Sequence, residues 1–328
     1  MSPGVRPVRI GVVGAGSFGS MHVRTLLGLP EAELVAVVDS NPSALEALRR
    51  DRLDLPVFTE LEPALARGTA EAWVVASSTR THVEIAQRLL AASQTVLVEK
   101  PLAADRASAE TLRPLVAADS RNLMLGHLLL FAPEFRKLLE QARTRGPIVH
   151  FHAVRHRSTE HVNLYPGETP LELTMVHDLY LALALMQGRE PTTVRGRLMP
   201  RPGGGCDLVL AELEWGNETW GSFTASFLTP PALGLNGFDR FEVHGRDWGA
   251  RMTLNPQPLE VWAERTEWPL ALDIFDDPSA PAGWLAEELR AFCRVVRGTA
   301  SVPVGARYED ALRVLDWIER VRQSAHAH

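Results

Sequence analysis

Residues 8–19 read VRIGVVGAGSFG, and this stretch decides the fold of the chain. Its first half, Val8 to Val13, is a short apolar run rich in β-branched residues, which is typical of a buried parallel strand. Its second half is a Gly-x-Gly-x-x-Gly turn, and a helical pattern follows from Ser20 to Leu29. A strand, this turn and a helix in succession predict a site for a dinucleotide.

The three glycines of the turn have different expected roles. Gly14 permits the tight turn after the strand, Gly16 lets the backbone approach a pyrophosphate, and Gly19 lets the helix pack closely on the strand. The N–H groups at the start of the helix, around Ser17 and Phe18, would face the phosphates. The alternative is a glycine-rich turn with a purely structural role.

A second sequence feature supports the prediction of a dinucleotide site. Leu34 to Val38 predicts the next strand, and Asp39 ends it, 20 residues after Gly19. A carboxylate at this place accepts hydrogen bonds from the adenosine ribose. Its charge would repel a 2′-phosphate, and Ser40 and Asn41 offer no adjacent arginine, so NAD is favoured over NADP.

Composition limits the classes of protein to which this chain can belong. The chain has 328 residues, enough for two domains, with 45% hydrophobic and 23% charged residues. A net charge of −6 argues against a nucleic-acid partner, and the apolar runs are too short to span a bilayer. The first residues lack the apolar core of a signal peptide. Cys206 and Cys293 are the only cysteines and have no metal-ligand spacing, so we expect a reducing cytoplasm.

Short apolar strands alternate with helical patterns up to residue 127. Further strands are expected at 56–58, 72–76, 95–98 and 123–125. This alternation predicts right-handed βαβ units and a doubly wound parallel sheet, in which ligands bind at the carboxyl ends of the strands. The segments that follow the later strands are therefore candidates for the cofactor site: Ser77, Ser78, Thr79, Arg80, Thr81 and His82; Glu99, Lys100 and Pro101; Gly126 and His127.

The pattern changes near residue 146. Ile148 to His156 alternates like a half-buried strand, and several strand-like runs lie between residues 193 and 262. A long helical pattern covers 170–187, and amphipathic helices are expected at 284–297 and 308–322. We expect a dinucleotide-binding domain with a doubly wound sheet at 1–127 and a second, α/β domain at 128–328, with its closing helix at 307–323.

Four features in this order resemble the Gfo/Idh/MocA family, named for glucose–fructose oxidoreductase, inositol dehydrogenase and a rhizopine-catabolism protein. They are the glycine turn with Asp39, the tripeptide Glu99-Lys100-Pro101, the pair His177-Asp178, and a closing helix that begins Tyr308-Glu309-Asp310. The resemblance implies an NAD(P)-binding Rossmann domain and an α/β domain with an open, mostly antiparallel sheet. It also implies a homodimer or homotetramer through that sheet, and a typically cis Lys-Pro bond.

The resemblance makes Lys100 and His177 the catalytic candidates. Lys100 would polarise a substrate carbonyl or stabilise an alkoxide, and His177 would pass the hydroxyl proton. The alternatives are a surface lysine paired with Glu99 and a core histidine on an apolar helix. Gly126-His127 looks like the branch of the family that handles nucleotide sugars and other sugars, which makes His127 a substrate candidate.

The sequence departs from the family pattern near His177. Many members carry an aspartate four residues before the histidine, where this chain has Leu173. Thr174 and Tyr180 lie three residues on either side and share the histidine's face of a regular helix, so either could contact the substrate. The departure leaves the substrate and the mechanism open.

Basic residues before this helix permit two further interpretations. Arg155, His156, Arg157 and His161 could bind a substrate phosphate or carboxylate, or form an exposed polar loop. The cluster His150, His152, His156 and His161 could suggest a metal site. His150 and His152 share one strand face, but no cysteine or carboxylate completes a ligand set at a suitable spacing, so no metal is expected.

The sequence thus predicts an NAD(P)-dependent oxidoreductase that transfers a hydride between nicotinamide and a carbon of a sugar, polyol or nucleotide sugar. One alternative is a dinucleotide-binding member of the family with weak or no activity. Another is a reductase of a non-sugar substrate, because some relatives act on bile pigments, imines or dihydrodiols.

Overall fold

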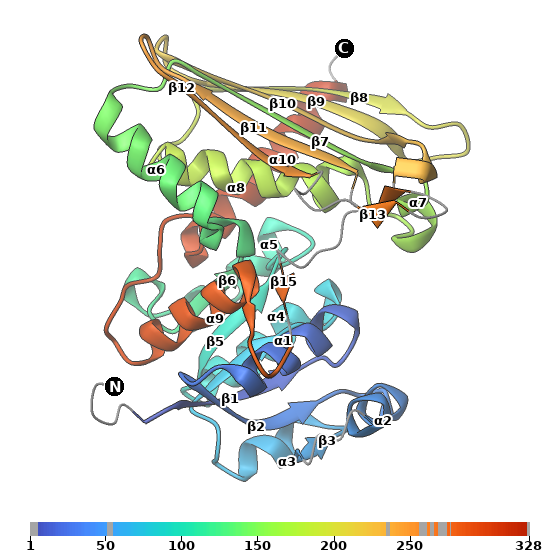
Figure 1. Cartoon of the computed structure of the whole chain (residues 1–328), viewed down its shortest axis with the longest axis vertical. Helices are drawn as coiled ribbons and strands as arrows, with labels where there is room; N and C mark the ends of the chain where they lie inside the picture. Colours follow the sequence, from blue (N-terminus) through green and yellow to red (C-terminus); the bar gives the residue numbers. More distant parts are fainter. Residues whose placement is uncertain are drawn as a thin grey trace. The chain divides into compact units, whose positions relative to one another are not determined.

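A computed structural model describes residues 6–50, 55–233, 237–255, 261–262, 266–267, 274–275 and 277–326. The chain forms two compact units. Unit 1 comprises Met1–Ala132 and Ala271–Leu312, and unit 2 comprises Pro133–Leu270 and Arg313–His328. Figure 1 shows a sheet with helices in each of them. Within the described ranges, no helix has the length and apolarity needed to cross a membrane.

Unit 1 holds a six-stranded sheet of order β3-β2-β1-β4-β5-β6, in which every pair is parallel. The strands are β1 (Val8–Val13), β2 (Ala32–Val38), β3 (Val57–Phe58), β4 (Ala72–Val75), β5 (Thr95–Glu99) and β6 (Leu123–Gly126). The strands β4 and β6 are buried along their whole length, as expected from their apolar sequences AWVV and LMLG. The predicted doubly wound parallel sheet is confirmed.

Helices connect these strands. They are α1 (Ser17–Gly28), α2 (Pro42–Arg50), α3 (Leu61–Ala66), α4 (Thr79–Ala91) and α5 (Arg106–Glu110). The helix α5 is short, because it ends at Glu110 and a 3₁₀ turn covers Arg113–Leu115. Pro114 lies in this turn, and a proline cannot donate the backbone hydrogen bond that an α-helix needs there.

A segment from the far end of the sequence also belongs to unit 1. It contains β15 (Ile274–Phe275) and α9 (Gly283–Val296), and the backbone N–H of Leu125 donates to Ala306 O at 2.8 Å. The domain boundary expected between residues 127 and 128 would place this segment in the second domain. In the structure, Ala271–Leu312 belongs to unit 1. α10 (Tyr308–His326) crosses the boundary between the units at residue 312.

Unit 2 holds a second six-stranded sheet of order β12-β11-β7-β10-β9-β8. Its strands are β7 (His150–Ser158), β8 (Thr193–Pro200), β9 (Cys206–Trp215), β10 (Thr219–Thr229), β11 (Phe238–His244) and β12 (Gly249–Asn255). Only the β7–β10 pair in this sheet is parallel. The mostly antiparallel second sheet is therefore confirmed. A separate two-stranded ribbon pairs β13 (Val261–Trp262) with β14 (Thr266–Glu267).

One face of this sheet is covered and forms the core of unit 2. The rings of Phe151, Phe223 and Phe241 pack on one another across β7, β10 and β11. Trp215 meets Trp317 edge to face, with ring centroids 5.9 Å apart. α8 (Val176–Leu185) and α10 lie on this side of the strands, while α6 (Pro133–Arg145) contacts β12 (Figure 1). This burial fixes the helix that carries His177.

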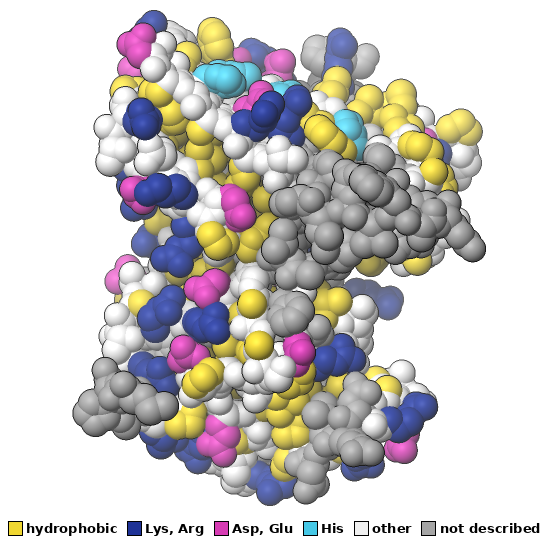
Figure 2. Space-filling model, viewed as in Figure 1, with side chains coloured by type: hydrophobic (Ala, Val, Ile, Leu, Met, Phe, Trp, Pro, Cys, Tyr) yellow, Lys and Arg dark blue, Asp and Glu magenta, His cyan; other side chains and the backbone are white. Residues whose placement is uncertain are grey.

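The opposite face carries both histidine and apolar side chains. Trp220 is 55% exposed and Leu228 is 49% exposed, and both alternate along β10 with buried residues. Figure 2 shows histidine and hydrophobic side chains on the surface of unit 2. The expected oligomer through this sheet stays a prediction.

Candidate active site

The glycine turn has the geometry that its sequence predicts. Gly14 has a φ of +103°, and a Cβ there would lie 2.5 Å from Ala76 O. A Cβ at Gly19 would lie 2.2 Å from Gly14 O, so only glycine allows α1 to pack this closely on the end of β1. A Cβ at Gly16 would meet nothing within 4 Å. Space next to Gly16, at the N-terminus of α1, suits an incoming phosphate.

Asp39 connects the second strand to this turn. Its Oδ2 accepts a hydrogen bond from the backbone N–H of Ala15 at 2.6 Å, and its Oδ1 accepts one from Asn41 at 2.8 Å. A carboxylate has about four lone-pair positions, so it can still accept from ribose hydroxyls. The turn and Asp39 therefore form one unit that fits the ribose and pyrophosphate of a dinucleotide. A bound dinucleotide would supply the nicotinamide ring that takes or gives the hydride.

The segment after β4 is held by its own hydroxyl groups. The hydroxyls of Ser77 and Thr81 lie 2.8 Å apart, and Thr81 donates to Ser78 O. α4 begins at Thr79 after Ser78 as N-cap, and Ser78 makes no side-chain capping bond. His82 is 1% exposed, with its Nδ1 2.8 Å from Pro101 O.

Lys100 follows β5 directly, and the Lys100–Pro101 peptide bond is cis, as the resemblance implied. Glu99 is 6% exposed. Its Oε1 accepts from His22 Nε2 at 2.8 Å, and its Oε2 accepts from the backbone N–H of Lys100 at 3.3 Å. Glu99 thus supports the turn from inside unit 1, and its role as a direct cofactor contact stays a prediction.

A second buried carboxyl group lies near Glu99. Glu288 on α9 is fully buried, and the backbone N–H of His127 lies close enough to its carboxyl group to lower its pKa by a small amount. Burial and the nearby charge of Glu99 raise the pKa of Glu288 well above its usual range. Glu288 therefore retains its proton to a higher pH than an exposed glutamate does. His127, a substrate candidate, is itself fully buried in unit 1 after β6.

In unit 2, His177 lies near the start of α8 and is half-buried. Its neighbour Asp178 is 2% exposed and accepts two hydrogen bonds from Arg155 on β7, at 2.8 and 3.1 Å. Burial raises the pKa of Asp178, and the guanidinium of Arg155 opposes that shift. This ion pair anchors the helix turn that carries His177 to the sheet.

Arg155 has an internal position. It is 3% exposed and also donates to Asp239 on β11 at 2.8 Å. Arg157 donates to the same carboxylate at 2.8 Å. This corrects the expectation of an exposed polar loop, because these arginines lie on β7 and their charges are paired inside unit 2. Arg155 as a substrate contact stays a prediction.

The helix around His177 starts differently from the expected regular pattern. Leu171–Met175 forms a π-helical turn before α8, which changes the angular spacing on which the face assignment of Thr174 depended. Thr174 is 2% exposed and donates to Pro170 O at 2.6 Å, and Tyr180 is 1% exposed. Leu173 is half-buried, as His177 is. Substrate contacts by Thr174 and Tyr180 stay predictions.

The histidines of β7 pair with serines on β10. His150 and His152 both lie within 3.1 Å of Ser222 Oγ, and His156 lies 2.7 Å from Ser226 Oγ. Burial lowers the pKa of each of these histidines. Across the described part of the chain, no three histidine, cysteine or carboxylate side chains are grouped to hold a metal ion.

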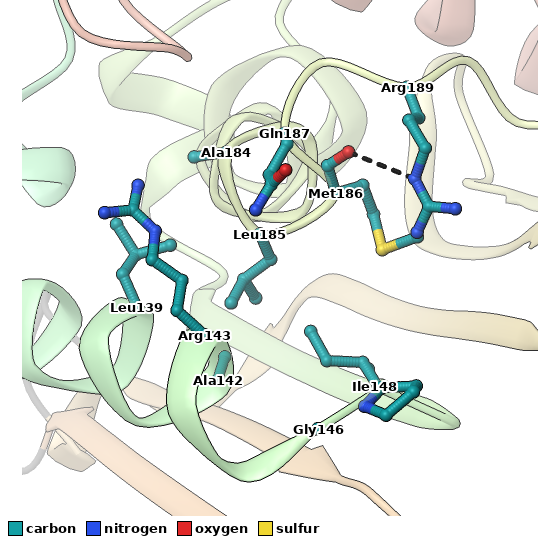
Figure 3. A pocket seen from close by; sticks show the side chains of 11 residues that line it. Leu139, Ala142, Arg143, Gly146, Ile148, Ala184, Leu185, Met186, Gln187 and Arg189 are labelled. Atoms are coloured by element: carbon teal, nitrogen blue, oxygen red, sulfur yellow. Dashed lines mark hydrogen bonds between the residues drawn. The ribbon is translucent and has the colours of Figure 1, made fainter.

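A hollow of about 380 Å³ lies elsewhere in unit 2. Figure 3 shows that side chains of α6, such as Leu139 and Arg143, face the end of α8 across it. Arg189 Nε donates to Met186 O at 3.4 Å on its border. Because His177 lies at the other end of α8, this hollow is separate from the catalytic candidates of unit 2.

Sequence reasoning missed His22 and Glu288. Both positions carry a signal, since His22 falls on the apolar face of α1 with Val23 and Leu26, and Glu288 lies between Leu285 and Phe292 on the buried face of α9. A polar side chain on an apolar helix face needs a partner within the fold. The helical period alone does not say which partner it has.

Comparisons with known proteins show what this chain is similar to. Residues 8–127 match the family model GFO_IDH_MocA, described as an oxidoreductase family with an NAD-binding Rossmann fold. The inositol 2-dehydrogenase 1 of Saccharopolyspora erythraea is 34% identical over 180 residues, which cover 52% of each chain. The inositol 2-dehydrogenase of Rhizobium meliloti is 29% identical over 77% of this chain and 78% of its own. The chain thus spans about half the length of the first of these relatives.

A solved structure is similar over nearly the whole chain. GenD2 from gentamicin A biosynthesis, in complex with NAD, has a TM-score of 0.80 at 23% identity. The match covers 98% of this chain and 95% of GenD2. At this identity the likeness establishes the fold of both units.

Proposed function

Because this chain belongs to the Gfo/Idh/MocA oxidoreductase family, we propose that it is an NAD-dependent dehydrogenase that acts on CH–OH groups of a cyclic polyol or sugar. The observation that carries this proposal is the joined geometry of the glycine turn and Asp39, with Lys100 at the end of the strand β5 in the same sheet. Inositols are the first substrates to test, because both curated relatives described above are inositol 2-dehydrogenases.

The chain's own residues have distinct tasks in this proposal. The open space at Gly16 admits the pyrophosphate, and Asp39 accepts from the adenosine ribose and disfavours a 2′-phosphate. Lys100 holds the reacting oxygen by its ammonium group, which stabilises negative charge there. His177 takes the hydroxyl proton during oxidation and returns it during reduction.

A second function is favoured by one observation. Leu173 stands where many family members carry an aspartate, and its half-buried aliphatic side chain cannot hold or move a proton. A dinucleotide-binding protein with weak dehydrogenase activity would fit this substitution. NADH binding without turnover of any inositol, sugar or imine would favour this second function.

The direct test follows nicotinamide reduction with NAD and a panel of myo-inositol, scyllo-inositol, glucose and UDP-N-acetylglucosamine. Lys100→Ala and His177→Ala are compared with the wild type, and NADH binding is titrated in each. We expect both variants to bind NADH and to lose turnover by about 100-fold or more. Turnover that is unchanged in Lys100→Ala contradicts the proposed mechanism.

We further propose a homodimer or homotetramer in the cytoplasm. Exposed Trp220 and Leu228 on the open face of the unit 2 sheet support such an interface, because large apolar patches on a surface mark interaction sites. Light scattering of the wild type and of Trp220→Glu measures the assembly. A wild-type mass of one subunit contradicts it.

A further inference from the structure

Two buried histidines flank the turn that carries Lys100. His22 on α1 contacts Glu99, the residue before Lys100, with Nε2 and Oε1 2.8 Å apart. His82 on α4 contacts Pro101, the residue after Lys100, with Nδ1 and the carbonyl oxygen 2.8 Å apart. Both imidazole rings are at most 1% exposed.

The His22 contact fixes Glu99 at both carboxylate oxygens. A carboxylate only accepts, so His22 donates through Nε2, while the backbone N–H of Lys100 donates to the other oxygen at 3.3 Å. A hydrogen bond to a buried charge is stronger than one between neutral groups. A Cβ at Gly126 would lie 2.7 Å from Glu99 Oε1, so β6 leaves the carboxylate little room to move.

The His82 contact holds the other side of the turn. Its second ring nitrogen, Nε2, lies 3.0 Å from Ser77 O at the end of β4. The ring therefore bridges the carbonyl of Pro101 to the neighbouring strand end. Carbonyl oxygens only accept, and an uncharged imidazole has a single N–H, so such a ring donates to one of these two carbonyl oxygens. His82 and His22 reach the turn from different helices and contact residues on opposite sides of Lys100.

We propose that His22 and His82 are positioning residues for Lys100, fixing the turn and acting on the reaction only through it. This inference rests on the proposed function, because it takes Lys100 as the residue that touches the substrate. A small displacement of a catalytic group lowers the rate strongly, whereas the glycine turn that binds the dinucleotide is held by separate contacts.

The first experiment needs no substrate. Hydrogen exchange is measured by mass spectrometry on peptides that cover residues 95–105 in the full chain with NADH. His22→Leu removes the donor, and His22→Gln keeps an N–H that can reach Glu99. We expect faster exchange of the Lys100 amide in the first variant than in the second. Equal exchange in wild type and both variants overturns the inference.

The second experiment measures kcat, KM and the NADH dissociation constant with NAD and myo-inositol. We expect His22→Leu to lower kcat by about 10- to 100-fold, with a change of about threefold or less in NADH affinity, and His22→Gln to recover most of the loss. In the Lys100→Met background, His22→Leu should lower the residual rate no further. Thr25→Val is the matched control, since Thr25 is fully buried on the same helix.

The outcomes distinguish a failure of the catalytic role proposed for Lys100 from a failure of the positioning role proposed for His22 and His82. If Lys100→Met alone leaves turnover unchanged, the catalytic role proposed for Lys100 fails, and the inference fails with it. If Lys100→Met is inactive but the His22→Leu loss multiplies independently, or matches the His22→Gln loss, only the inference is overturned. His82→Leu and His82→Gln give the same comparison from α4, and thermal melting shows which variants are folded.

Discussion

The carboxylate of Asp39 accepts a hydrogen bond from the backbone N–H of Ala15, with Oδ2 and N 2.6 Å apart. This bond connects the two sequence features that predict a dinucleotide site, the glycine turn and the acidic residue 20 positions after Gly19. The same side chain therefore shapes the turn, and we expect its charge to disfavour a cofactor with a 2′-phosphate.

Asp39→Asn is expected to weaken NADH binding and to narrow the preference for NADH over NADPH. The amide keeps one acceptor oxygen but loses the charge that repels a 2′-phosphate. Fluorescence titration with both reduced cofactors measures the ratio of dissociation constants, and we expect it to change by about 10-fold or more. An unchanged ratio would show that Asp39 does not set cofactor choice.

Gly16→Ala and Gly19→Ala should have opposite effects on stability and binding. A Cβ at Gly16 meets nothing within 4 Å, so Gly16→Ala should melt like the wild type and lose NADH affinity by about 10-fold or more, since the methyl occupies the phosphate's space. Gly19→Ala forces a methyl to 2.2 Å from Gly14 O and should cost about 1–3 kcal/mol of stability. Unchanged NADH binding in Gly16→Ala would contradict the phosphate position.

Arg155→Met should destabilise unit 2 strongly. The substitution leaves Asp178 and Asp239 buried without their shared guanidinium, which costs about 3–5 kcal/mol. Arg6→Met is the control, because the Arg6–Glu71 pair is exposed at the arginine and should contribute about 0–1 kcal/mol. Denaturant unfolding monitored by tryptophan fluorescence compares the two, and equal losses would refute the structural role of Arg155.

We expect the stability of Glu288→Gln relative to the wild type to increase as the pH rises, because the wild type loses stability and the uncharged glutamine does not titrate. The pKa of Glu288 is raised in the folded state, so its stabilising contribution is complete below the ordinary value of 4.5 and is lost as the pH rises through the folded pKa. In that window the unfolded chain releases a proton that the folded chain retains. The free energy of unfolding then falls by up to about 1.4 kcal/mol per pH unit.

Melting curves recorded from about pH 5 to about pH 8 test this linkage. The gap in melting temperature between Glu288→Gln and the wild type should widen toward the upper end. Glu287→Gln is the matched control, because Glu287 lies one position away on α9 and is partly exposed beside Arg290. Parallel curves for wild type and Glu288→Gln would mean that Glu288 does not retain its proton.

Strand positions followed from local pattern over much of the chain. Phe238 to His244 lies within the region 193–262 where strands are expected, and it is a strand whose buried and half-buried residues alternate, since half-buried strands repeat every two residues. The helix after Asp105 was less predictable, because the apolar pattern continues beyond Glu110 while Pro114 prevents regular helix. The apolar pattern favours a longer helix there and Pro114 opposes it, and the sequence does not show which of the two effects dominates.

The sequence by itself determined the dinucleotide turn, because Gly14, Gly16 and Gly19 act through backbone freedom at neighbouring positions. Tertiary structure alone decided which distant groups meet. His22 and Glu99 are 77 residues apart, and Glu288 belongs to unit 1 only because residues 271–312 return to it. Such pairs form because a buried polar group must find a partner or lose its charge, and the folded chain fixes what lies within reach.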